Sequence, residues 1–126
     1  MNLSHWIGTP YDLLNINGLN CWGLVANIRC ELFDDELPDY QSKSLSRSDL
    51  CAAFTAAFLK DDHGFKKVDK PENYCVVIFK RNNKASHCGL WLDGKVLHSS
   101  SRTKQACYEL FSVARLGFHE VEFWQK

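Results

Sequence analysis

The stretch HCGLWLDGKVLHSS, residues His87 to Ser100, contains two runs of alternating residues joined by Asp93-Gly94. Asp-Gly between such runs is the strongest short-range signal for a β-hairpin with a two-residue turn. This turn pairs Leu92 with Lys95, and paired residues share one face of the hairpin. The sequence therefore predicts one strand before the turn and one after it, at residues 85–92 and 95–99.

This register places two histidines on the same face of the hairpin. His87 and His98 become diagonal neighbours, about 7–8 Å apart between their backbones, so that two imidazoles can meet. Gly89 lies opposite His98 and leaves room above the sheet. The other face is predicted to be the core side, and it carries Cys88 together with three leucines, Leu90, Leu92 and Leu97. Cys88 is therefore expected to be a core residue.

The segments around the hairpin predict an α+β domain. Residues 65–68 form a weak strand, YCVVIF (74–79) is a continuous apolar run typical of a buried strand, and HEVEFW (119–124) alternates like a closing strand. Residues 104–116 fit either a short helix or an irregular crossing. Ser48 is a candidate cap for a helix with one apolar face, formed by Leu50, Phe54 and Phe58. We expect one domain, residues 1–126, with N-terminal helices and an antiparallel sheet of four to six strands.

A second helix is predicted in GLNCWGLVANIRCELF, residues Gly18 to Phe33. Its apolar positions have helical spacing and form one face, Cys21, Val25, Ile28 and Leu32. Asn20 is a good N-cap residue and puts Cys21 in the first turn. A helix N-terminus and a nearby imidazolium both lower the pKa of a thiol, so a reactive cysteine gains most at this position.

These positions suggest a catalytic arrangement if the sheet packs against the start of the helix. Cys21 would then be the nucleophile, His87 the general base and His98 the residue that orients the His87 ring. Backbone N–H groups of the first helical turn would receive the charge on the carbonyl oxygen. Two readings remain open: the histidines are ordinary surface residues, or they bind a metal. The metal reading lacks a carboxylate or thiolate aimed at the two imidazoles, so no metal ligand is predicted.

Composition excludes several classes of function. Fifteen basic residues balance fifteen acidic ones, so charge favours neither nucleic acid nor a membrane surface as a partner. The apolar runs are too short to span a bilayer, and the N-terminus shows no signal peptide. The six cysteines include no CxxC pair, and we expect them to be mostly reduced and buried.

Three stretches together resemble the NlpC-type cysteine peptidases, papain-like enzymes that cleave bacterial cell-wall peptides. They are GTPY (8–11), NCWGLV (20–25) and HCGLWLDGKVLHSS (87–100), and VEFWQ (121–125) is similar to the family's closing strand. The resemblance implies a papain-like α+β fold. It also matches Cys21, His87 and His98 to the catalytic residues.

The same resemblance suggests which residues meet the substrate. Tyr11 matches the family tyrosine that lines the cleft, while Trp22 and Asn20 flank the nucleophile on the substrate and oxyanion side. The sequence departs from the family in two places: Asn20 replaces an aspartate, and Pro71-Glu72-Asn73 replaces a Pro-Gly-Asp turn. The first change affects local charge and substrate contacts.

The resemblance implies hydrolysis of amide bonds in peptidoglycan stem peptides through a thioester, without cofactor or metal. The tryptophan after the cysteine and the following LPDY are most similar to the branch found in bacteriophage tail-tip and tail-assembly proteins. Phage tail proteins are then partners, and the protein is made in the cytoplasm and acts at the cell wall. Two alternatives stay open: an antibacterial amidase toxin, with an immunity protein as partner, and a structural tail component with a degenerate site.

Overall fold

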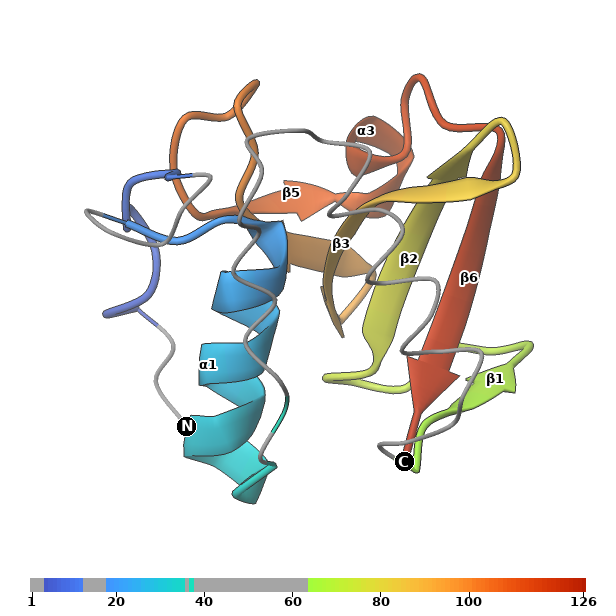
Figure 1. Cartoon of the computed structure of the whole chain (residues 1–126), viewed down its shortest axis with the longest axis horizontal. Coiled ribbons are helices and arrows are strands. Elements are labelled where there is room, and N and C mark those ends of the chain that lie inside the picture. The colour runs from blue at the N-terminus through green and yellow to red at the C-terminus, as the bar shows by residue number, and fades with distance from the viewer. Residues whose placement is uncertain (1–3, 13–17, 36, 38–63) are drawn as a thin grey trace.

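The computed structural model describes residues 4–12, 18–35, 37 and 64–126, which form an α+β arrangement of one long helix beside a six-stranded sheet (Figure 1). The sheet order is β1-β6-β2-β3-β4-β5, and every neighbouring pair is antiparallel. The helices are α1 (Cys21–Phe33) and α3 (Phe111–Ala114). The strands are β1 (Lys66–Val68), β2 (Val76–Arg81), β3 (Lys84–Leu92), β4 (Lys95–His98), β5 (Cys107–Leu110) and β6 (Glu120–Gln125). The helix predicted from Ser48 lies outside the described residues.

The central hairpin has the predicted register. Leu92 pairs with Lys95, Trp91 with Val96 and Leu90 with Leu97. Asp93 and Gly94 both have positive φ, 51° and 81°, which is the conformation that a type I′ two-residue turn requires. The hairpin prediction is therefore confirmed.

Both faces of the sheet are buried, whereas the sequence predicted a core on one face. The face that carries Cys88 packs against α1, in a cluster that includes Trp22, Leu24, Val25, Ile28, Leu90 and Leu97. The opposite face has its own cluster, in which Val77, Phe79 and Val96 pack with Ala114 of α3. The residues after β5 return across this second face and cover it, which a strand-by-strand pattern did not reveal.

Helix α1 begins where its sequence predicts. The side chain of Asn20 accepts a hydrogen bond from the Gly23 N–H at 2.7 Å and so caps the first turn. Asp34 ends the helix in the left-handed conformation, and its N–H donates to the Cys30 carbonyl. Among the described residues, no helix is long and apolar enough to cross a membrane.

A buried ion pair fastens the far end of α1 to the sheet. Arg29 donates to the Asp35 carboxylate through Nε at 2.8 Å and to the Tyr74 carbonyl through Nη1 at 3.0 Å. Lys126, the last residue, also reaches Asp35, at 3.0 Å. Asp35 therefore joins the helix end to Lys126, and Arg29 joins the same helix end to the loop before β2.

Candidate active site

Cys21 is positioned by close backbone contacts at the start of α1. The Leu19 N–H donates to the Pro10 carbonyl at 2.9 Å, and a Cβ on Gly18 would lie 2.1 Å from the same oxygen. Only glycine permits this approach at position 18. Ser99, just after β4, donates to the Leu19 carbonyl at 3.4 Å. The start of the helix is thus fixed beside the end of the strand that carries His98.

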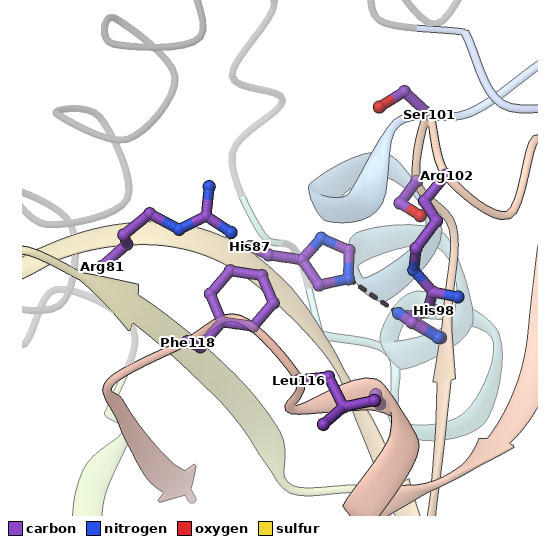
Figure 2. Close-up of a pocket in the computed structure, with 9 residues that line it drawn as sticks. Arg81, His87, His98, Ser101, Arg102, Leu116 and Phe118 are labelled. Atoms are coloured by element: carbon purple, nitrogen blue, oxygen red, sulfur yellow. Dashed lines mark hydrogen bonds between the residues drawn. The ribbon is translucent and has the colours of Figure 1, made fainter.

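A chain of hydrogen bonds runs through the two histidines. His87 Nε2 and His98 Nδ1 are 2.7 Å apart, and both rings are buried. The dashed line in Figure 2 marks this hydrogen bond. His98 Nε2 lies 2.8 Å from the Glu109 carboxylate. Arg102 in turn pairs with Glu109. The ring of His87 also stacks on Phe118 at an interplanar angle of 11°, which further restricts its rotation.

His98 is neutral at neutral pH. Burial lowers its pKa to about 4, the positive charge that His87 can carry acts in the same direction, and Glu109 opposes both. The contact with Glu109 is therefore a hydrogen bond from a neutral ring rather than an ion pair. A neutral His98 that donates from Nε2 to Glu109 keeps Nδ1 as an acceptor for the Nε2–H of His87.

The Cys21 thiol interacts with both His87 and its neighbour Cys88. Hydrogen bonds from Cys88 and then from His87 hold the pKa of Cys21 well below its usual value, although burial opposes them. The side chain is 5% exposed. A thiolate at this position is stabilised by a charged His87, which His98 and Glu109 keep in one orientation.

A pocket of about 190 Å³ lies on the histidine side of the site. Its lining includes His87 and His98, the aromatic ring of Phe118 and two cationic side chains, Arg81 and Arg102 (Figure 2). Cys21 does not line this pocket, but His87 contacts both the pocket and the thiol. The pocket offers a mixed apolar and cationic surface beside the proposed general base.

The three residues expected on the substrate and oxyanion side differ in their placement. Tyr11 is half-buried, and its backbone N–H donates to the Lys104 carbonyl, next to the loop that leads into β5. Asn20 is buried and uses its side-chain oxygen to cap the helix. Trp22 is 1% exposed and its indole packs in the core cluster, so its place on the substrate side stays a prediction.

The sequence did not reveal that two further residues, Glu109 and Cys88, contribute to the site. Glu109 lies in a segment whose structure the sequence left ambiguous, and β5 brings it to the face of His98. Cys88 was placed on the correct face, but that face is the one against which the start of α1 packs. The prediction that Cys88 is a core residue is confirmed, and its thiol in addition neighbours that of Cys21. The available signal was the run CYEL (107–110), in which Cys107 and Glu109 are two residues apart and therefore share one face if the run is a strand.

The structure also places a carboxylate and a thiol close to His98, the two kinds of ligand that the sequence did not bring to the histidines. His98, Cys107 and Glu109 each have a potential ligand atom, and the three atoms lie within 4.8 Å of one another. The sequence predicts no metal here because it aims no carboxylate or thiolate at the histidines, and β5 provides one of each.

Comparison of this chain with protein-family models and with curated proteins gives no match.

Proposed function

We propose that this protein is a papain-like cysteine hydrolase that cleaves amide bonds. The observation that carries the proposal is the connected series Cys21, His87, His98 and Glu109, in which the thiol pKa is lowered and each imidazole has a fixed partner. The alternative that the histidines are ordinary surface residues does not explain why both rings are buried, lie 2.7 Å apart and have a carboxylate behind them.

The proposed reaction has two stages. The Cys21 thiolate attacks the amide carbonyl, and the resulting oxyanion is stabilised by N–H groups at the start of α1. His87 gives its proton to the leaving amine, which departs and leaves a thioester on Cys21. His87 then takes a proton from water, the water attacks the thioester, and the carboxylic acid and the thiolate are released.

The substrate class that we propose is the peptide stem of peptidoglycan. The resemblance of GTPY, NCWGLV and the hairpin to NlpC-type peptidases supports this choice. The pocket supports it as well, because Arg81 and Arg102 suit the free carboxylates of stem peptides. A place in a bacteriophage tail, acting at the cell wall, belongs to the same proposal.

The test is digestion of purified cell walls, with the released peptides identified by mass spectrometry. Cys21→Ala is expected to abolish release, because it removes the proposed nucleophile. Cys30→Ala is the matched control, since Cys30 is an exposed cysteine on the same helix. Undiminished release by Cys21→Ala would overturn the mechanism.

Two other roles would give different results in this assay. A structural tail component with a degenerate site would release nothing even as the wild-type protein. A delivered amidase toxin would cleave walls through the same residues, and only its delivery and an immunity protein that blocks it would separate it from a tail enzyme.

A further inference from the structure

Strands β4 and β5 assemble three different donor groups on one face of the sheet. Cys107 pairs directly with His98, and Glu109 pairs with Val96, two residues before His98, so all three side chains share that face. Their potential ligand atoms lie within 4.8 Å of one another, and His98 Nε2 is 2.8 Å from Glu109. We propose that His98, Cys107 and Glu109 bind a zinc ion, and that bound zinc inhibits the Cys21 nucleophile.

The donor set suits zinc better than other common ions. Imidazole nitrogen, thiolate sulfur and carboxylate oxygen are its three usual protein ligands, whereas magnesium and calcium prefer oxygen alone. Bond lengths of about 2.0–2.3 Å around a tetrahedral ion place its ligand atoms roughly 3.3–3.7 Å apart. The Glu109 oxygen therefore has to move back from His98 by several tenths of an ångström, and the Cys107 sulfur, now within 4.8 Å of both other ligand atoms, has to reach the same separation. Both are side-chain rotations on partly exposed groups.

Zinc binding replaces interactions that the ligand residues already make. Arg102 currently pairs with the Glu109 carboxylate, and its side chain is 59% exposed, so it can swing into solvent when a cation takes that carboxylate. Cys107 gives up its thiol proton to the solvent when it binds the metal. Three protein ligands leave a fourth position for water, as in zinc sites that stay open.

Zinc at this position opposes the active form of the site, an effect that rests on the proposed function. When Nε2 of His98 binds the metal, the remaining ring proton sits on Nδ1, which faces Nε2 of His87 at 2.7 Å. His87 must then accept a hydrogen bond at Nε2. A doubly protonated His87 would place two N–H groups against each other. The thiolate–imidazolium pair is therefore excluded while zinc is bound.

Binding is tested by titrating zinc chloride into the reduced, metal-free protein in a calorimeter. We expect one equivalent to bind to the wild-type protein, and Cys107→Ser to weaken binding by roughly tenfold or more. Cys30→Ser is the matched control and is expected to bind like the wild type, because Cys30 is exposed on α1. Arg102→Ala removes the competing cation and is expected to tighten binding, by up to about fivefold. A variant that gains affinity cannot be explained by misfolding.

Cobalt(II) in place of zinc gives a direct view of the sulfur ligand, through the thiolate-to-metal absorption band. The wild-type protein is expected to show this band, Cys107→Ser to lose it and Cys30→Ser to keep it. The zinc site would be overturned if the protein binds no metal, or if Cys107→Ser changes neither the affinity nor the absorption band.

Zinc is also expected to stop amide cleavage by the wild-type protein. Cleavage that is unaffected at saturating zinc would overturn the inhibitory role. If the wild type cleaves nothing, the proposed function fails while the two binding measurements still decide the zinc site.

Discussion

The thiol of Cys88 is buried beside that of Cys21 and lowers its pKa. Cys88 is fully buried, and its hydrogen bond is the largest influence that lowers the pKa of Cys21. A thiol is a weak donor to a neutral acceptor, but a hydrogen bond to a charged one is worth about 1.5–3 kcal/mol. In the proposed mechanism Cys88 is a positioning residue, because it acts through Cys21, the proposed nucleophile.

Replacing Cys88 tests this role. Cys88→Ala is expected to raise the pKa of Cys21 and to reduce the thiolate present at pH 6 by about tenfold or more, because a donor to the sulfur is lost. The measurement is the ultraviolet absorbance of the thiolate as a function of pH, with Cys21→Ser subtracted. Cys88→Ser keeps a donor and is expected to retain most of the effect. An unchanged titration in Cys88→Ala would show that Cys88 only fills space.

The residues that the sequence identified share a local signal. Cys21, His87 and His98 could be predicted because a helix cap and a two-residue turn fix their positions within short stretches of chain. Glu109 could not, since its approach to His98 depends on the pairing of β4 with β5 across a loop that has no regular pattern.

At the scale of elements, the β3–β4 hairpin holds the two histidines in register, and Gly89 permits its close packing. A Cβ at position 89 would lie 2.6 Å from Val96 Cγ1 and 3.0 Å from both the Leu97 carbonyl and His98 Cβ. Two of these neighbours belong to buried side chains and one to the backbone, so none can move aside freely.

Gly89→Ala is therefore expected to destabilise the fold by about 1–3 kcal/mol, through overpacking, and to reduce cleavage by displacing His98. Urea unfolding followed by fluorescence gives the stability, and cell-wall digestion gives the activity. Ser86→Ala, on the same strand and only half-buried, is expected to change both very little. Wild-type stability and activity in Gly89→Ala would contradict the packing described for this hairpin.

Most elements of the sheet were predictable, and the exceptions have a common cause. The hairpin and the long helix carry strong local signals, and their bounds agree with prediction to within a residue or two. Residues 104–116 divide into the short strand β5 and the single turn of α3, because tertiary pairing with β4 decides their conformation. Residues of this segment cover the second face of the sheet, so the burial of that face was not predicted either.

Over the whole molecule, Asp35 pairs with Arg29 and Lys126, and Arg29 also donates to the Tyr74 carbonyl, so this cluster joins the end of α1, the loop before β2 and the C-terminal residue. Burial raises the pKa of its carboxyl, but hydrogen bonds from Lys126 and Arg29 outweigh burial and leave the pKa below its ordinary value of 3.8. A carboxyl with a lowered pKa in the folded state stabilises the fold above its unfolded pKa. That stabilisation is lost as the pH falls from about 4 through the folded value.

Asp35→Asn is expected to lower the free energy of unfolding by about 3 kcal/mol at pH 7, because it leaves the buried Arg29 without its counter-charge. It is also expected to lose less stability than the wild type when the pH falls below 4. Urea unfolding at pH 7, 5 and 3 measures both effects, with the exposed Asp69→Asn as control. Equal stability of Asp35→Asn and the wild type at pH 7 would show that the pair does not fasten the helix to the sheet.

The central claim is that Cys21 is a thiolate held by His87, and the pH dependence of its alkylation tests this most directly. Iodoacetamide modification, assigned to Cys21 by peptide mass spectrometry, gives the midpoint of the profile, which does not depend on how accessible the 5% exposed side chain is. We predict a midpoint well below that of Cys21 in the urea-unfolded chain, and a rise toward the unfolded value in His87→Ala. A folded midpoint equal to or above the unfolded one, or one that His87→Ala leaves in place, would contradict the account.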